Sequence, residues 1–176
     1  MNQERCTASV DSGSNQQTIR IMVVDDHPLL RGGIAALIEG QSDMELVAQA
    51  ANGREGIEQF QEHQPDITLM DLQMPEKNGI DAILTICEES PDARIIVLTT
   101  YSGDAQALRA LKAGARAYLL KNLLHKELLA TIRTVHAGNK TMSPSVAAEL
   151  ANHSGEKVLT TREIEVLRLV ALVPLH

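Results

Sequence analysis

The stretch DITLMDLQMPEKNGID at residues 66–81 decides the fold, because it runs from a buried strand through a turn into an amphipathic helix. Residues 66–70 are largely apolar, as expected of a strand covered on both faces, and Asp71 follows at the carboxyl end. The Asn78 and Gly79 dipeptide predicts a turn. Beyond it, apolar residues recur at helical spacing, namely Ile80, Ile83, Leu84 and Cys87.

Short apolar runs and amphipathic segments alternate along most of the chain. Ile19–Val24 is almost wholly apolar, and further strands are expected at 45–50, 94–99 and 116–119. Helices are expected where apolar residues recur every three or four positions, at 28–40, 54–63, 80–87, 104–113 and 125–137. Five strands alternating with five helices predict an α/β fold with a five-stranded parallel sheet, doubly wound, with helices on both faces.

The composition excludes several classes of protein. The chain has 176 residues and a formal net charge of −7, so it lacks the positive charge with which proteins coat nucleic acid. Cys6 and Cys87 suggest neither a disulfide framework nor a metal site, which fits a reducing cytoplasm. Residues 1–18 are rich in Ser, Gln and Asn and predict a disordered tail, not a signal peptide. No apolar run approaches the roughly 20 residues that a transmembrane helix needs.

Three carboxylates are predicted to meet at one edge of the sheet. Asp25 and Asp26 directly follow the first strand, and Asp71 follows the third. Ligands bind beyond the carboxyl ends of the strands in such sheets, so we expect these side chains to share a pocket. Without neutralisation they would repel one another and raise each other's pKa. A hard divalent cation relieves the repulsion, and Mg²⁺ is the usual ion where a phosphoryl group completes the shell.

A hydroxyl and an amine complete the predicted pocket. Thr99 closes the fourth strand and Lys121 follows the fifth. An acceptor carboxylate, a metal ion, a hydroxyl and a lysine together suit phosphoryl transfer, because that reaction mainly needs its charge neutralised. Each residue alone has an ordinary structural explanation, whereas their joint placement at successive strand ends does not. His27, beside Pro28 at a helix start, is interpreted as a surface residue near the ligands and not as a ligand.

Four segments carry a resemblance to a known family. They are IMVVDDHPLLRGGI (21–34), DITLMDLQMPEKNGID (66–81), RIIVLTTY (94–101) and GARAYLLK (114–121). Residues 19–137 thereby resemble a receiver domain of the flavodoxin-like, chemotaxis-regulator fold, as found in two-component response regulators. The DDHPLLRGG run and LTTREIEVLRLVA (159–171) are similar to the NarL/FixJ family, which joins a receiver to a LuxR-type helix-turn-helix.

The resemblance implies a role for each pocket residue. Asp71 would accept a phosphoryl group from a sensor histidine kinase, and Lys121 would pair with a phosphoryl oxygen. Asp26, Asp71 and the backbone carbonyl of Gln73 would bind Mg²⁺, with Asp25 contributing through water. The protein would be a phosphoacceptor with self-phosphorylation and self-dephosphorylation chemistry only, and not otherwise an enzyme.

The resemblance also implies a conformational switch. Thr99 would move towards the phosphoryl group and let Tyr118 turn inward, so that a local change of charge reaches a distant surface. Gln73 and Tyr101 flank the acceptor, and Tyr101 is expected to shield the acyl phosphate from water and slow its hydrolysis. Asn122 departs from the family, because many receivers place a proline there, so a cis peptide bond is not assumed.

The carboxyl-terminal part is predicted to hold a remnant of a second domain. Residues 138–159 are interpreted as a linker with a short helix near 145–150. Residues 160–176 resemble the first helix of a LuxR-type helix-turn-helix, with a capping box formed by Thr160 and Glu163. The sequence stops at His176 before any recognition helix, so DNA binding is expected of a full-length relative and is doubtful for this chain.

Three functions fit the sequence. The first is a phosphorylation-switched transcriptional regulator that forms a homodimer when phosphorylated, through its first and last receiver helices or through residues 104–137. The second is a stand-alone receiver that acts through protein contacts, as a phosphate sink or a competitor for dimerisation. The third is a Mg²⁺-dependent phosphohydrolase of the haloacid-dehalogenase type. It is disfavoured because such enzymes carry a DxD pattern after the first strand, where this chain has Asp25 and Asp26 adjacent.

Overall fold

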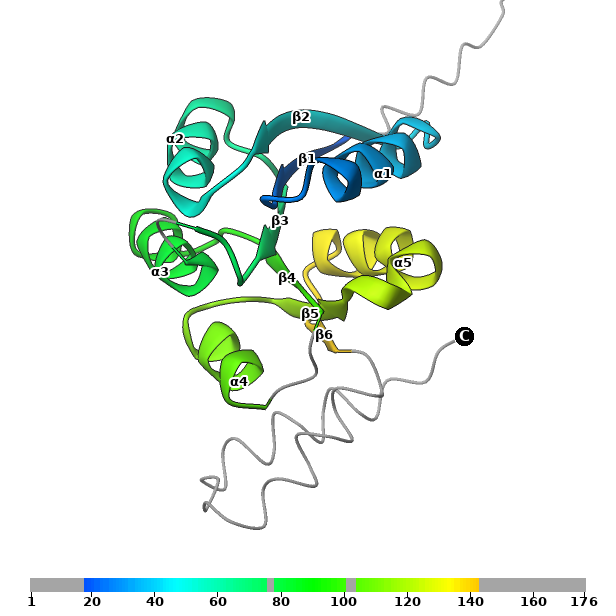
Figure 1. Cartoon of the computed structure of the whole chain (residues 1–176). Helices are drawn as coiled ribbons and strands as arrows, with labels where there is room; N and C mark the ends of the chain where they lie inside the picture. Colours follow the sequence, from blue (N-terminus) through cyan, green and yellow to red (C-terminus); the bar gives the residue numbers. More distant parts are fainter. Residues whose placement is uncertain (1–17, 76–77, 101–103, 143–176) are drawn as a thin grey trace, which may run out of the picture.

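Strands and helices alternate in the order that the sequence predicts (Figure 1). The computed structural model describes residues 18–75, 78–100 and 104–142. The strands are β1 (Ile19–Val24), β2 (Met44–Ala50), β3 (Ile67–Asp71), β4 (Ile95–Thr99), β5 (Ala117–Leu120) and β6 (Thr141–Met142). The helices are α1 (Pro28–Glu39), α2 (Gly53–His63), α3 (Gly79–Glu89), α4 (Asp104–Lys112), the 3₁₀ turn η1 (Lys121–Leu123) and α5 (Leu124–His136).

The sheet is parallel throughout, with the strand order β2-β1-β3-β4-β5-β6. The chain runs outward from β1 to β2 and then crosses back to β3, so the strand order reverses between β1 and β3. The predicted five-stranded, doubly wound sheet is confirmed. It gains β6, a two-residue strand paired with β5 inside the stretch that was predicted to be linker. Two residues are too short to leave a periodic pattern in the sequence.

The core has two layers, one on each face of the sheet, because alternate residues of a strand point to opposite faces. In β1, Met22 and Val24 pack into the layer that contains Phe60 of α2, whereas Ile21 and Val23 pack into the layer that contains Leu128 of α5. Burial of each such side chain stabilises the fold by roughly 1.5–3 kcal/mol. Strands covered on both faces need near-continuous apolar runs, and this explains the composition of β1, β3 and β4.

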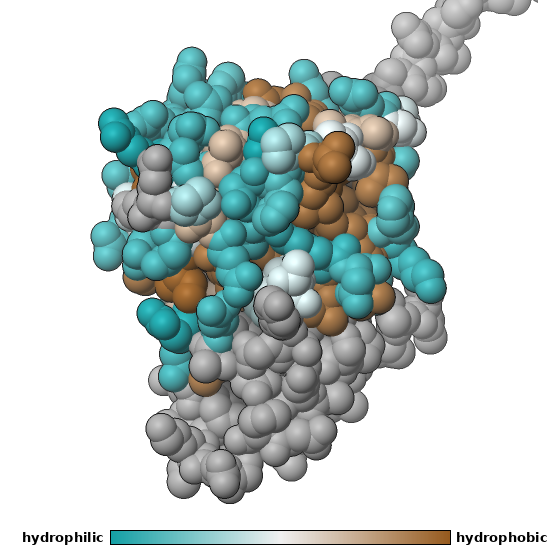
Figure 2. All heavy atoms as spheres, in the orientation of Figure 1, coloured by the Kyte–Doolittle hydropathy of each residue, from teal (hydrophilic) through white to brown (hydrophobic). Residues whose placement is uncertain are grey.

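The surface is mainly hydrophilic, with hydrophobic residues gathered where α1 and α5 lie side by side (Figure 2). Leu29, near the start of α1, has 93% of its surface exposed. Leu84 of α3, one of the residues whose spacing predicted this helix, is also exposed. Among the described residues, no helix has both the length and the apolar character needed to span a bilayer.

Candidate functional site

The strand register brings the predicted carboxylates together at the carboxyl edge of the sheet. Val24 of β1 pairs with Met70 of β3, so Asp25 and Asp71 each follow a paired residue on neighbouring strands. Both carboxylates are buried, whereas Asp26 lies at the rim and is partly exposed. The backbone N–H of Asp25 still donates to the carbonyl of Ala50 on β2, which holds the end of β1 in the sheet.

Lys121 places its amine between the two buried acids. It begins η1 directly after Leu120, which pairs with Thr99 across β4 and β5. Its Nζ lies 2.8 Å from Asp71 Oδ2, to which it donates a hydrogen bond, and 2.7 Å from Asp25 Oδ2. Only 10% of the lysine side chain is exposed. One cation therefore serves two buried anions.

The surroundings of Asp71 only partly compensate the negative charge of its ionised carboxylate. Burial is the main cause that raises the pKa of Asp71, and the charge of Asp25 adds to it. Hydrogen bonds from Lys121 and from the backbone N–H of Gln73, together with the lysine's charge, only partly oppose this rise. Burial by itself would lower the pKa of Lys121, but the carboxylates of Asp25 and Asp71, 2.7 and 2.8 Å from its Nζ, outweigh burial and raise that pKa. The lysine is therefore held as a cation, while ionised Asp71 is disfavoured in the folded protein.

The donor set fits a divalent cation. Ligand atoms of Asp25, Asp26, His27 and Asp71 all lie within 4.8 Å of one another. Asp25 Oδ2 and Asp26 Oδ1 are buried and accept no hydrogen bond from the described residues. Their near neighbours are single nitrogen atoms, Lys121 Nζ at 2.7 Å and His27 Nδ1 at 2.8 Å. Carboxylate oxygens with unused lone pairs are what a hard cation binds.

The segment after β1 is built to present these acids. The backbone N–H of His27 donates to Asp25 Oδ1 at 2.8 Å, and the Arg31 guanidinium donates to the backbone carbonyl of Asp25. Pro28 starts α1, where its fixed φ suits the first turn and its missing N–H costs nothing. Sequence reasoning did not assign Arg31 to the pocket, because no spacing pattern links an arginine side chain to one particular carbonyl.

Gly79 is a second residue whose role sequence reasoning missed. Its N–H donates to the carbonyl of Leu72 at 3.2 Å, which folds the loop after β3 back onto the acceptor strand. A Cβ at this position would lie 2.0 Å from the backbone oxygen of Asp71, so only glycine fits. The Asn78 and Gly79 pair signalled a turn, and Asn78 instead caps α3 by accepting from the N–H of Asp81.

Four further residues were predicted to act at the site, namely Thr99, Tyr118, Gln73 and Tyr101. Thr99 is buried at the end of β4, beside the strand that carries Asp71. Tyr118 is only 1% exposed and packs in the core, so its ring already has the inward position that the resemblance assigns to the switched form. Gln73 is exposed, and its N–H donates to Asp71 Oδ1 at 3.2 Å. Tyr101 lies outside the described residues, and no cis peptide bond occurs within them, Asn122 included.

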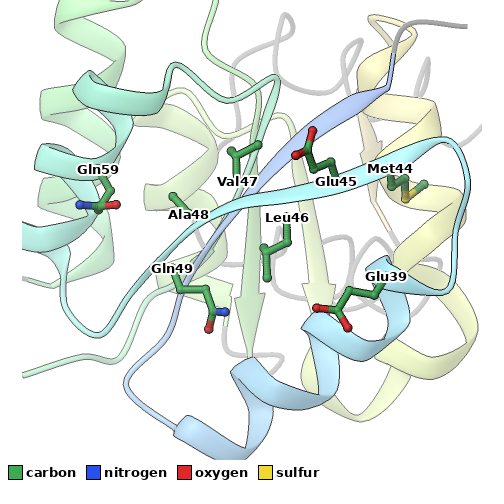
Figure 3. Close-up of a pocket in the computed structure, with 8 residues that line it drawn as sticks. All are labelled: Glu39, Met44, Glu45, Leu46, Val47, Ala48, Gln49 and Gln59. Atoms are coloured by element: carbon green, nitrogen blue, oxygen red, sulfur yellow. The ribbon is translucent and has the colours of Figure 1, made fainter.

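A separate shallow groove follows the open edge of β2 (Figure 3). Its lining comes from β2 itself with one residue each from α1 and α2, namely Met44, Glu45, Leu46, Val47, Ala48, Gln49, Glu39 and Gln59. It contains no member of the acid pocket and therefore plays no part in the chemistry described above.

Comparison with known proteins identifies the family. Residues 21–133 match the model of the response regulator receiver domain. The chain is 39% identical over 161 residues to the transcriptional regulatory protein LiaR of Bacillus subtilis (strain 168), covering 87% of this chain and 76% of that protein. A crystal structure of a LuxR-family two-component response regulator from Aurantimonas sp. SI85-9A1 is 41% identical, with a TM-score of 0.75, and covers 80% of this chain and all of that one. The chain belongs to the LuxR/NarL family of response regulators.

Further relatives of this response regulator agree. The oxygen regulatory protein NreC of Staphylococcus carnosus (strain TM300) is 35% identical over 167 residues, which cover 87% of this chain and 77% of that protein. A structure of the RcsB response regulator of Salmonella typhimurium is 27% identical with a TM-score of 0.73, and covers 90% of this chain and 79% of that one. The predicted resemblance to the receiver and NarL-type family is thus confirmed.

Proposed function

We propose that this response regulator is switched by phosphorylation of Asp71 and that a sensor histidine kinase supplies the phosphoryl group as phosphohistidine. The observation that carries the proposal is the position of Lys121, whose Nζ lies 2.8 Å from Asp71 and 2.7 Å from Asp25. A phosphoryl group joined to Asp71 would bring further negative charge to this point. A buried amine already held there as a cation is suited to receive it.

The reaction is a transfer between two carriers. A carboxylate oxygen of Asp71 attacks phosphorus, the P–N bond of phosphohistidine breaks, and the imidazole leaves with the bonding electron pair. The product is an acyl phosphate, and Lys121 pairs with one of its oxygens. The negative charge of ionised Asp71 is only partly compensated, and this favours the reaction. Conversion to an acyl phosphate removes the buried carboxylate charge and places the new charge beside Lys121.

The carboxylate pocket would hold Mg²⁺ through Asp26, Asp71 and the backbone carbonyl of Gln73, with Asp25 contributing through water. When bound, the ion supplies charge neutralisation at the phosphoryl oxygens. The two buried carboxylate oxygens without a hydrogen bond, on Asp25 and Asp26, support this assignment.

The output would be control of transcription, as the names of the LiaR and LuxR-family relatives suggest. Thr99 and Tyr118 would pass the change from the pocket to the face of β5, where dimerisation and DNA binding by a full-length protein would be regulated in the cytoplasm. A stand-alone receiver acting through protein contacts is the alternative. A gel-shift assay at low salt with acetyl phosphate separates the two, because sequence-specific retardation by this chain contradicts the alternative.

The direct test of the proposal is intact-protein mass spectrometry after incubation with acetyl phosphate and Mg²⁺. We expect one labile phosphoryl adduct on the wild-type protein and none on Asp71→Asn. The matched control is Asp92→Asn, at an exposed acid in a loop, which should keep the adduct. An adduct that persists in Asp71→Asn, or that forms equally well with excess EDTA, would contradict the proposal.

A further inference from the structure

Arg31 is a charged residue beside the acid pocket that the proposed function does not use. It lies in the first turn of α1, where its N–H donates to the carbonyl of His27 at 3.1 Å. Helical side chains point back towards the amino end of their helix, so an arginine in the first turn can reach the strand end that precedes it. The Arg31 guanidinium donates to the backbone carbonyl of Asp25, directly after β1. The side chain thus joins α1 to the segment that carries two of the pocket acids.

This contact holds the peptide that links the two acids. The carbonyl of Asp25 and the N–H of Asp26 belong to one planar peptide unit, so a bond to the carbonyl also sets the direction in which Asp26 leaves the strand. Asp25 has further support, because its N–H donates to Ala50 of β2 and its Oδ1 accepts from the N–H of His27. The Asp26 carboxylate has less, because its Oδ1 accepts no hydrogen bond from the described residues and its ion-pair partner, the His27 ring, is 66% exposed.

The chemistry of the contact leaves the carboxylate oxygens of the pocket free. Within the part of the chain that the structure describes, the Arg31 side chain donates to a backbone carbonyl and forms no ion pair with a carboxylate. Lys121, by contrast, lies against the carboxylates of Asp25 and Asp71. A hydrogen bond from a charged donor is stronger than one from a neutral donor, so a single guanidinium can hold the peptide. The arginine can therefore orient the acids without occupying the oxygens that a hard cation binds.

We propose that Arg31 is a positioning residue for the divalent cation of this pocket. By holding the peptide between Asp25 and Asp26, it keeps ligand atoms of both acids within 4.8 Å of one another. Residues that hold metal ligands in place commonly change metal affinity by about 10–100-fold when they are replaced. The inference rests on the Mg²⁺ site of the proposed function and adds to it a residue outside the ligand set.

The test is isothermal titration calorimetry of the full chain with MgCl₂. Arg31→Met keeps an apolar stem and removes the donor, and we expect Mg²⁺ affinity to fall by about tenfold. Arg31→Lys keeps a cationic donor and should lose less than about threefold. The matched control is Arg20→Met near the start of β1, because the Arg20 guanidinium also donates to a backbone carbonyl, that of Gln64 at 3.0 Å. This control should leave Mg²⁺ affinity unchanged.

A second measurement needs no metal ion. In backbone amide NMR of the metal-free protein, we expect the resonances of Asp26 and His27 to shift in Arg31→Met and to stay in place in Arg20→Met. Only the first variant releases the carbonyl of Asp25. A general loss of stability would not move these two resonances selectively, so the measurement separates positioning from a merely structural role.

Three outcomes would overturn the inference. Unchanged Mg²⁺ affinity in Arg31→Met would mean that the contact does not matter to the ion. Equal losses in Arg31→Met and Arg31→Lys would mean that the donor is not the cause, and an equal loss in Arg20→Met would point to general stability. A wild-type protein that binds no Mg²⁺ would contradict the proposed function instead, and the metal-free resonances would still show whether Arg31 holds the peptide.

Discussion

Two clusters of ion pairs lie at opposite ends of the sheet and differ in how well their charges are compensated. At the amino end, Arg133 of α5 donates to both carboxylate oxygens of Asp43, at 2.8 and 3.0 Å, and to Gln41 at 3.0 Å. Both partners are partly exposed, with 45% of the Arg133 side chain and 27% of the Asp43 side chain accessible. At the carboxyl end, one buried lysine serves Asp25 and Asp71.

The pKa shifts show what this difference means. The hydrogen bond from Arg133 is the main cause that lowers the pKa of Asp43, and burial opposes it only weakly. Burial is the main cause that raises the pKa of Asp71. The exposed pair therefore stabilises the fold modestly through ordinary complementarity. In the buried cluster, two carboxylates share one lysine, so negative charge is in excess. This excess favours the binding of a cation, or a reaction that removes the charge of the carboxylate.

Gly79→Ala should break the carboxyl-end cluster most severely. The added Cβ would lie 2.0 Å from the backbone oxygen of Asp71, and neither backbone can move without disturbing β3. We expect the free energy of unfolding in urea to fall by about 3 kcal/mol. Gly33→Ala is the matched control, because an alanine there meets nothing within 4 Å in an exposed helix. It should raise stability by about 0.5–1 kcal/mol. Equal effects of the two substitutions would contradict the role given to Gly79.

Lys121→Met should show how much the buried cluster depends on its single cation. Two buried carboxylates would lose their partner, and we expect the free energy of unfolding at pH 7 without metal to fall by about 2–3 kcal/mol. The raised pKa of Lys121 gives stability that is fully present below its ordinary value of 10.5 and is lost as the pH rises through the higher value in the folded protein. The difference between wild type and variant in urea should shrink over that alkaline range. A difference that stays constant there would contradict the ion-pair explanation.

Asp43→Asn should have the smallest effect, because the amino-end pair is partly exposed. We expect a loss of about 0.5 kcal/mol at pH 7, reduced further by added salt. Since the pKa of Asp43 is lowered, its contribution is present above the ordinary value of 3.8 and disappears as the pH falls through the lower value in the folded protein. Thermal unfolding at several pH values measures this. A loss as large as that of Lys121→Met would remove the contrast between the two ends.

Most of the fold was predictable because its periodic signals are strong. β1 was predicted to the residue, since an apolar run covered on both faces has sharp ends. The pocket residues followed from one topological rule, which places strand ends together. The exposure of Leu84 could not be predicted, because helical spacing defines an apolar stripe and the position of the edge of that stripe depends on the neighbouring helix.

The finer features of the site depend on contacts that no local pattern encodes. The approach of His27 Nδ1 to two carboxylates depends on the side-chain rotamers after β1, and sequence reasoning left this residue near the ligands without a role. The need for glycine at position 79 arises from the return of the loop onto Asp71, which is a tertiary contact. Such constraints become visible only when the backbone path is known.

The short strand β6 has a mechanical consequence. Thr141 and Met142 pair with Ala117 and Tyr118, so these last described residues are joined to the strand that carries the buried tyrosine. Because β6 is paired with β5, a displacement of β5 would also move Thr141 and Met142. Thr141 and Met142 are thus fixed beside Tyr118 by the sheet itself.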